Sequence, residues 1–212
     1  MAARARRGLD FVLGREAILR ALNEARLDRR LIVTPLLSET QIGEVSVDLR
    51  LGTEFVTTRR ANIPAVEPLK KDEAEVQTLK WQELFLVPRG KKLVLHPGEL
   101  ILGGSFEYVR LPPDLGAYVT SRSSWGRLGL VIATATAIAP GYRGIITLEL
   151  TNVGNAPLVL SPGVRIAQML FHHIGEDVVY RGRYRCPTIP EMGKIHADEE
   201  LGFWLTEREG PR

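Results

Sequence analysis

The first feature of the hydrophobic pattern is a helical spacing near the N-terminus. In residues 14–27, GREAILRALNEARL, the apolar side chains are Ile18, Ala21, Leu22 and Ala25. Their intervals place them on one side of an α-helix, with polar residues on the other. The pattern predicts one amphipathic helix here.

The pattern then changes to one typical of strands. The segments LIVTPLL and EVSVDLRLGTEFV are short and rich in β-branched residues. Over residues 45–50 apolar side chains alternate with Ser46, Asp48 and Arg50. Such an alternation is typical of a half-buried strand whose polar side chains face outward. Residues 59–80 contain prolines and the charged run KKDEAEV, and we expect them to form a surface excursion.

Residues 84–174 read as a succession of strands with a repeated turn. The octapeptides LHPGELIL (95–102) and LSPGVRIA (160–167) share the pattern Leu-x-Pro-Gly-x-x-Ile. Proline and glycine suit the two central positions of a tight turn, so each octapeptide predicts a hairpin. Two such hairpins favour a double-layered β fold, a jelly roll or a sandwich. Chance similarity of turn chemistry is the alternative.

Composition supports one domain with appendages. The chain has 212 residues, of which 44% are hydrophobic, enough for a substantial core. We expect a basic N-terminal extension at 1–13, a β domain at 14–174, and an arm or flexible end at 175–212. No window approaches the roughly 18 apolar residues of a membrane span.

Charge and cysteine content limit the expected cellular compartment and the expected class of binding partner. The net charge is +3 with both signs spread along the chain, which argues against a partner that is a nucleic-acid polymer. A local basic pocket for a small anion remains open. The single cysteine, Cys186, cannot form an internal disulfide, so we expect a reducing compartment, the cytoplasm.

Several motifs of known chemistry are absent from the sequence. It contains no GxxxxGK[ST] phosphate loop and no zinc-deaminase pattern of HxE followed by PCxxC. His96, His172, His173 and His196 do not have a metal-ligand spacing, and the adjacent pair would point to opposite faces of a strand. We expect no protein-held metal.

One glutamate lies in an otherwise apolar strand. In GIITLEL (144–150), Ile146, Leu148 and Leu150 share one face, while Thr147 and Glu149 share the other. An unpaired carboxylate is costly to bury, so near a core it must be paired, protonated or in a wet cleft. The alternative is an outward-facing glutamate on a half-exposed strand.

The stretch SRSSWGRLGL (121–130) combines hydroxyl groups with fixed positive charge. Ser123 and Ser124 can cap a short helical turn, whose free N–H groups can hold phosphate. Arg122 and Arg127 add bidentate donors, and Gly126 permits close approach of a ligand. The alternative is a capped turn with two solvated arginines.

Together these stretches resemble one family. The run SRSSWGRLGL followed by TATAIAPGYRGIITLELTNVGNAPLVLSPGVRIAQMLF is similar to the dCTP deaminase family of the dUTPase-like superfamily, as are LIVTPLL, EVSVDLRLG and VLHPGELILG in the same order. The resemblance covers about residues 14–174. It implies a mainly-β fold, a distorted jelly roll or β-barrel with an N-terminal helix, assembled as a homotrimer with active sites at subunit boundaries. It also implies zinc-independent deamination of dCTP to dUTP and ammonia, with magnesium carried on the triphosphate.

The resemblance assigns roles to positions of this chain. It implies Glu149 as the proton-shuttling group, with Ser123 holding the attacking water and Arg127 stabilising the charged arrangement. The positions that it implies for substrate binding are Arg122, Ser124, Trp125, Gly126, Ala135, Ala139, Tyr142, Thr147, Leu148, Gln168, Tyr180 and Arg183. Trp125 is bulkier than the family's usual aliphatic residue, which packing against a neighbouring subunit would explain.

The sequence also departs from the family pattern. Ala139 stands where the family has an aspartate that contacts the sugar, and Ala137 stands where some deaminases have arginine. The corresponding aspartate is the water-activating base of dUTP pyrophosphatases, so Ala139 argues against that activity. Tyr142 matches an aromatic residue under the deoxyribose, which keeps a deoxynucleotide as the expected substrate. The alternatives are a dUTP pyrophosphatase or bifunctional enzyme, and a non-catalytic nucleotide-binding trimer.

Overall fold

Strands dominate the computed structural model, which describes residues 12–58, 82–132 and 137–193. The helical elements are α1 (Arg15–Leu22), the 3-10 turn η1 (Glu39–Gln41) and α3 (Ser123–Gly126). The strands are β1 (Ile32–Thr34), β2 (Val47–Thr58), β3 (Gln82–Leu86), β4 (Leu93–Leu95), β5 (Leu100–Arg110), β6 (Leu115–Ser121), β7 (Leu130–Ile132), β8 (Ala137–Ile138), β9 (Arg143–Asn152), β10 (Leu158–Leu160) and β11 (Arg165–His173). The expected mainly-β fold is confirmed.

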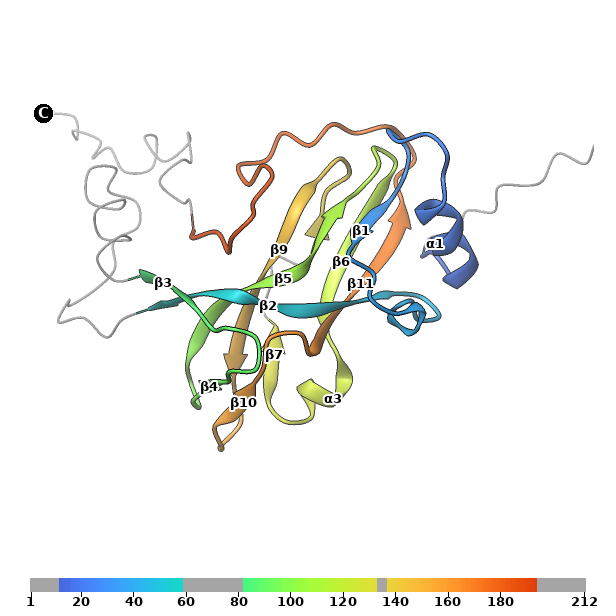
Figure 1. The fold of residues 1–212 in the computed structure, drawn as a ribbon. Helices are drawn as coiled ribbons and strands as arrows, with labels where there is room; N and C mark the ends of the chain where they lie inside the picture. Colours follow the sequence, from blue (N-terminus) through green and yellow to red (C-terminus); the bar gives the residue numbers. More distant parts are fainter. Residues whose placement is uncertain (1–11, 59–81, 133–136, 194–212) are drawn as a thin grey trace, which may run out of the picture.

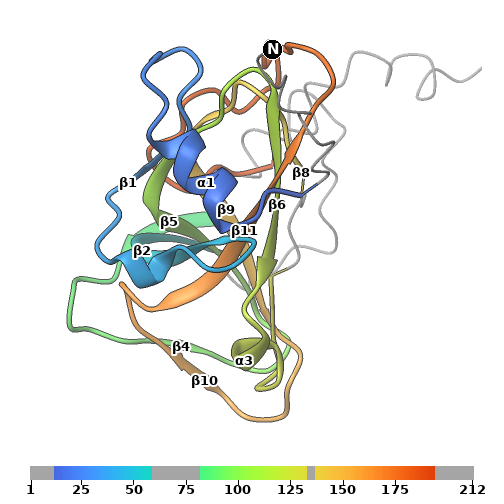
Figure 2. The same ribbon diagram turned by 90° about the vertical axis from the view of Figure 1, so that its right-hand side faces the viewer.

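Two antiparallel sheets make up the domain. The larger has nine strands, with the path β7-β9-β5-β2-β11-β6-β8, and with β1 added to β5 and β3 added to β2. The smaller sheet pairs β10 with β4. The large sheet curls so that its strands cross at steep angles around a shared interior (Figures 1 and 2). The largest fully buried side chains include Phe55 of β2, Phe171 of β11 and Leu148 of β9, so strands from across this sheet build one core.

The N-terminal helix is shorter than its sequence pattern predicts. Helix α1 ends at Leu22, and Asn23 closes it by donating from both its backbone and its side-chain nitrogen to the Leu19 carbonyl. Ala25 is therefore exposed rather than on the buried face. The domain also begins before residue 14, because Leu13 is buried and its N–H donates to the Phe171 carbonyl at 2.8 Å.

Strand β2 is buried on both faces, which corrects the expectation of an outward polar face. Asp48 and Arg50 are each 8% exposed. Inside the domain the fully buried Glu107 accepts hydrogen bonds from the Arg50 backbone at 2.7 Å and from the Gln41 amide at 2.8 Å. The Arg50 guanidinium lies 3.2 Å from the same carboxylate. Alternation along one strand cannot reveal such a network, since its partners come from other elements.

The two Pro-Gly turns form as predicted, but the predicted hairpins do not. Gly98 and Gly163 have positive φ angles of 77° and 89°, as these turns require. The strands that flank each turn nevertheless do not pair with each other: β4 and β10, which precede the turns, pair together instead. Each turn is thus a corner at which the chain passes from the small sheet to the large one.

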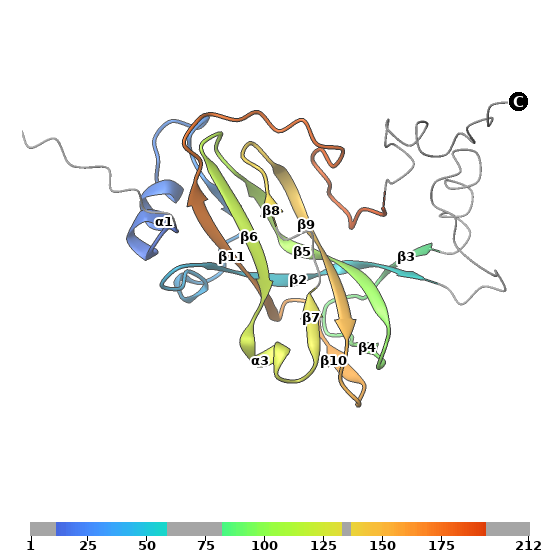
Figure 3. The same cartoon turned by 180° about the vertical axis from the view of Figure 1, so that it is seen from behind.

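The segment after β11 contacts the rest of the domain at several points of its described length. It crosses the top of the domain and descends beside β9 (Figures 1 and 3). The Cys186 N–H donates to the Arg143 carbonyl at 3.1 Å, and the Ile145 N–H donates to the Pro187 carbonyl at 2.9 Å. We call residues 175–193 the arm. Of the two expectations for this segment, these contacts fit an arm, and the flexible end stays a prediction.

Some expectations fall outside the described residues. These are the basic start up to residue 11, the excursion at 59–80, Ala135 and the tail from 194. Among the described residues, no helix combines the length and apolarity that crossing a membrane requires.

Candidate active site

The double-serine stretch forms a short helical turn between β6 and β7. Helix α3 is held by Trp125 N–H donating to the Arg122 carbonyl at 3.0 Å and Arg127 N–H donating to the Ser123 carbonyl at 3.0 Å. Its N-cap is Arg122, which makes no side-chain cap. Sequence reasoning expected the serines to cap the turn, and this expectation is wrong. They are its first two helical residues, and both are exposed.

Contacts with β11 fix this turn on the sheet. The Arg122 N–H donates to the Ile166 carbonyl at 3.1 Å. The Trp125 indole N–H donates to the Arg165 carbonyl at 2.9 Å, and the ring packs against the domain's own core. Part of the bulk of Trp125 is thus used within one chain, and its packing on a neighbouring subunit stays a prediction. Two contacts to consecutive β11 residues leave the serines and Arg127 on the outer side of the turn.

Arg122 is not a freely solvated arginine. Its Nη1 donates to Oδ2 of Asp48, which also lies 3.4 Å from Nη1 of Arg165. Gln168, predicted to contact the nucleotide, lies opposite Asp48 in the β11–β2 register, so the two share a face of the sheet. The structure therefore brings Arg122 and Gln168 into one neighbourhood around Asp48.

Glu149 lies on the outer face of β9, as the alternation predicted. Ile146, Leu148 and Leu150 are at most 3% exposed, whereas Glu149 is half-buried. Its carboxylate has no hydrogen-bond or ion-pair partner among the described residues. Desolvation by burial raises the pKa of this carboxyl group. Sequence reasoning had left open an outward-facing glutamate on a half-exposed strand, and the structure places Glu149 half-buried on that outer face.

Among the described residues, the pairing along the outer edge of β9 stops on either side of Glu149. On the side away from β5, β7 pairs with β9 only as far as the match of Ile132 with Leu150. The arm covers the same edge up to Thr147, whose hydroxyl accepts from the Glu191 N–H at 3.1 Å. Among the described residues, neither neighbour reaches Glu149. This stretch of edge is where a ligand or another chain could meet the carboxylate.

Two tyrosines predicted to bind the substrate pack against each other. Tyr142 and Tyr180 pack edge to face with ring centres 5.5 Å apart, and Gly141 lies under the Tyr180 backbone. The Tyr142 hydroxyl donates to the Ile145 carbonyl at 2.6 Å, and burial raises the pKa of this phenol. Tyr142 is 7% exposed, so only its edge is open to a ligand.

The described residues of one chain do not bring all the predicted groups into contact. Within the described part, no hydrogen bond or ion pair joins Glu149 to Ser123 or Arg127. The Leu148 side chain points into the core, so that residue could meet a nucleotide only through its backbone. Ala139 and Arg183 are exposed. The residues thus form two clusters on one chain, one around α3 and one along the edge of β9.

Comparison with known proteins identifies the family. The profile described as dCTP deaminase-like matches residues 12–174. The chain belongs to the dCTP deaminase-like family. A relative named dCTP deaminase from Natronomonas pharaonis is 42% identical over 85% of this chain and 97% of its own length. Another, named dCTP deaminase, dUMP-forming, from Halobacterium salinarum, is 40% identical over 84% of this chain and 94% of its own.

A solved structure agrees with the fold of this dCTP deaminase-like chain. The 2′-deoxycytidine 5′-triphosphate deaminase from Agrobacterium tumefaciens superposes with a TM-score of 0.56 and 25% identity. The match covers 77% of this chain and 48% of that longer chain. The family and fold inferred from the sequence motifs are therefore confirmed.

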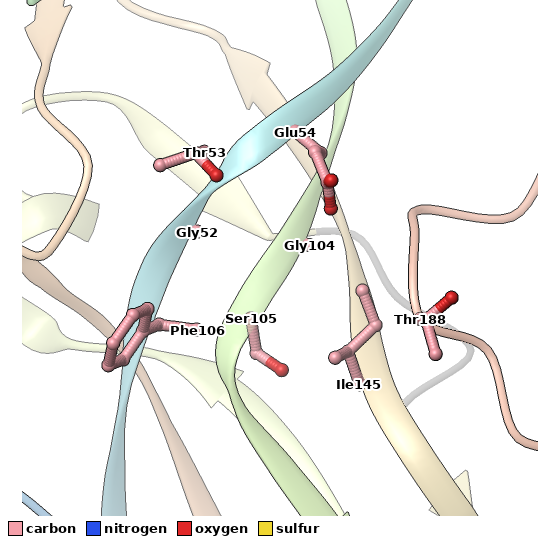
Figure 4. A pocket seen from close by; sticks show the side chains of 8 residues that line it. All are labelled: Gly52, Thr53, Glu54, Gly104, Ser105, Phe106, Ile145 and Thr188. Atoms are coloured by element: carbon pink, nitrogen blue, oxygen red, sulfur yellow. The ribbon is translucent and has the colours of Figure 1, made fainter. Parts of the chain in front are cut away.

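A pocket elsewhere on this dCTP deaminase-like domain is not the predicted site. It is lined by residues of β2, β5 and β9 and by Thr188 of the arm, and has a volume of about 130 Å³ (Figure 4). It lies where the ladders of β5 with β2 and β9 shift register, beside Ser105. It contains none of the predicted site residues and is smaller than the roughly 300 Å³ at which ligand pockets begin.

Sequence reasoning missed two residues next to the predicted site. Asp48 was assigned to an outward face, and Arg165 was noted only as part of a turn repeat. The available signal was chemical, since an acid and an arginine in otherwise apolar strands call for partners when buried. What was missing was the knowledge that β2 and β11 are neighbours.

Proposed function

We propose that this chain hydrolyses the 4-amino group of dCTP, giving dUTP and ammonia. The observation that carries the proposal is Glu149: a half-buried carboxylate with a raised pKa and no partner among the described residues, on the outer face of a strand within the family match. The names of the relatives supply the nucleotide.

The chemistry needs one group that can accept and return protons. Water adds to C4 of the cytosine, the bond from C4 to the amino nitrogen breaks, and ammonia leaves. Glu149 takes one proton from the water and passes it to the ring nitrogen. It then takes the second proton from the hydroxyl group now on C4 and gives it to the amino nitrogen, which leaves as ammonia while the C4 carbonyl forms. A carboxyl group suits this role better when its pKa is raised toward the working pH.

The remaining catalytic groups come from the α3 turn. Ser123 holds the water and Arg127 stabilises the charge that develops, with the Ala135 carbonyl facing the leaving amine. Ser123 in α3 and Arg127 directly after it are both exposed. Because one chain does not join them to Glu149, we propose that the turn of one subunit meets the β9 edge of the next in a homotrimer.

Nucleotide binding follows the same division. We propose that Arg122, Ser124 and Gly126 hold phosphate oxygens. Along β9 and the arm we propose contacts with base and sugar by Tyr142, Thr147, the Leu148 backbone, Tyr180 and Arg183, with Ala139 beside the sugar. From β11 we propose a contact with the nucleotide by Gln168, which lies in the neighbourhood of Arg122. No three His, Cys, Asp or Glu side chains of the described residues form a group that could hold a metal. From the family resemblance we propose that magnesium enters on the triphosphate.

We propose dUTP, not dUMP, as the product. Some relatives are named as dUMP-forming, so the family includes both outcomes. Cleavage of the phosphate chain needs a second base to activate a second water. Ala139 has no carboxylate to offer at the position where the resemblance places that base. The cytoplasm is the proposed setting, on the ground of the single cysteine.

The decisive experiment replaces Glu149 with glutamine. Glu149→Gln keeps the shape but cannot carry protons, so we expect dCTP turnover to fall by at least about 10²–10⁴ while dCTP still binds. Product formation is measured by ammonia release and chromatography of nucleotides, and binding by calorimetry. Glu54→Gln, a half-buried glutamate on β2 outside the site, is the matched control and should keep full activity.

The same assay separates the alternatives. Pyrophosphate and a monophosphate from the wild-type chain would indicate a dUTP pyrophosphatase or a bifunctional enzyme. Binding of nucleotide without product would indicate a non-catalytic trimer. Full activity of Glu149→Gln would refute the assignment of the shuttle while leaving the reaction itself intact.

A further inference from the structure

We infer that Asp48 is a positioning residue for nucleotide binding, because its carboxylate sets the direction in which Arg122 presents its guanidinium to the triphosphate. This inference rests on the proposed function and adds to it a residue that does not itself touch substrate.

The geometry places an inner acid behind an outer arginine. The Asp48 side chain is 11% exposed, whereas that of Arg122 is 36% exposed. Oδ2 of Asp48 accepts from Nη1 of Arg122. Arginine has five N–H donors in a planar fork, so fixing one nitrogen from behind orients the others. Asp48 is the only described partner of this guanidinium, which leaves its remaining donors for phosphate oxygens.

A second arginine fixes the acid in turn. Nη1 of Arg165 lies 3.4 Å from the same Oδ2. The Arg165 guanidinium also donates to the Thr40 carbonyl at 2.9 Å and to the Thr40 hydroxyl at 2.7 Å. Residues of η1, β2 and β11 therefore lock the carboxylate before a ligand arrives. Preorganisation of this kind lowers the entropy lost on binding.

Charge and position predict opposite effects when Asp48 is removed. The cluster of Arg122, Arg165 and Asp48 has one net positive charge. Loss of the acid would make it more positive, so charge alone predicts tighter binding of a triphosphate. Positioning predicts weaker binding, because Arg122 loses its fixed direction. The sign of the change therefore distinguishes the two.

The test is a double-mutant cycle between Asp48 and Arg122. Asp48→Asn, Arg122→Ala and the double variant are compared by KM and kcat for dCTP, and by calorimetric Kd in the Glu149→Gln background. We expect Asp48→Asn to raise KM and Kd about ten-fold, the scale of one charge-assisted hydrogen bond, with kcat within about two-fold. In the Arg122→Ala background it should have no further effect. Binding of deoxycytidine, which has no phosphate, should not change.

Matched variants separate positioning from folding. Asp28→Asn removes the same charge from an exposed pair with Arg26 and should leave KM unchanged. Asp48→Glu retains the charge and should recover part of the affinity. If Asp48→Asn does not fold, Thr40→Val replaces it in the double-mutant cycle with Arg122→Ala, since Thr40 is exposed. It removes one anchor of Arg165 and should raise KM about two-fold only where Arg122 is present.

The outcomes distinguish a failure of the positioning role of Asp48 from a failure of the proposed function. If the wild-type chain turns over dCTP but Asp48→Asn binds it equally or more tightly, the positioning role is wrong and the deaminase stands. A KM effect of equal size with and without Arg122 also overturns it. If the wild-type chain neither binds nor converts dCTP, the proposed function fails, and with it this inference.

Discussion

At the scale of the residue, Glu149 combines an open position with a desolvated carboxyl group. Inward neighbours on β9 fill the core, so the side chain cannot turn inward to find a partner. Burial raises its pKa, and no described donor offsets the desolvation. The ionised form is thus kept at a cost to stability, which is common for groups retained for function.

This cost predicts how stability depends on pH. Because the folded-state pKa is raised, Glu149 contributes fully to stability below the unfolded-state pKa of about 4.3, and that contribution is lost as pH rises through the folded-state value. Glu149→Gln should therefore raise the melting temperature relative to wild type at pH 8 and lose this advantage near pH 4. Thermal unfolding followed by circular dichroism at both pH values measures the difference. An advantage that grows toward pH 4 would contradict the sign.

The sequence pattern predicted the strand face of Glu149 correctly and that of Asp48 wrongly. Alternation on β9 identified the face of Glu149, because Ile146, Leu148 and Leu150 make the opposite face apolar along this stretch. The same argument on β2 failed for Asp48, which is buried by Arg122, a residue 74 positions away. A local pattern shows which residues share a face, but it does not show what covers that face.

At the scale of the element, the arm is held to β9 by a close approach at Gly144. This glycine has a φ of 141°, and a Cβ there would lie 2.3 Å from Cδ of Pro187. Two backbone hydrogen bonds join the strand and the arm on either side of this contact. The sequence GYRG gave no sign of it, because the partner lies some 43 positions later.

We predict that Gly144→Ala displaces the arm. The added methyl group clashes with Pro187 and strains the backbone, which should cost about 1–3 kcal/mol of stability. Trypsin should then cut faster after Arg181, Arg183 and Arg185. The rate of cleavage is measured by mass spectrometry of the fragments. Gly163→Ala is the matched control, since it has a φ of 89° but no atom within 4 Å of its added Cβ. Equal cleavage in both variants would show that the contact with Pro187 does not hold the arm.

The Pro-Gly corners show what element-level prediction can achieve. Turn chemistry is local, so the Pro-Gly pair in each octapeptide sufficed to predict the positive φ angles of Gly98 and Gly163. Strand pairing is not local: β4 pairs with β10, and the paired residues Leu95 and Leu158 are 63 positions apart in the sequence. Their matching Leu-Val-Leu sequences were visible, but nothing in the sequence showed that the two corners lie side by side.

At the scale of the whole molecule, the predicted residues lie in two clusters that one chain does not join. The α3 turn presents Ser123 and Arg127 outward, and the β9 edge presents Glu149. A cyclic trimer would bring the turn of each subunit to the edge of the next, giving three equivalent sites.

Shared sites predict complementation between inactive chains. Glu149→Gln and Arg127→Ala should each be inactive alone. Co-expressed in equal amounts, they should recover activity at about a quarter of the sites, because each site draws its two halves from different chains. Activity is measured per trimer after light scattering confirms the assembly. Co-expression of either variant with a chain carrying both substitutions is the control and should remain inactive. No recovery in the mixed trimers would place each site within one subunit.

The arm has one more consequence, which concerns unwanted association. An uncovered strand offers unpaired N–H and C=O groups to any extended polypeptide, a common start of fibrous aggregation. Beside residues 143–147 of β9 that place is taken by a segment with prolines at 187 and 190. Proline has no N–H to donate, so a further strand finds few donors on the outer side of this segment. The segment that covers β9 thus also ends the sheet.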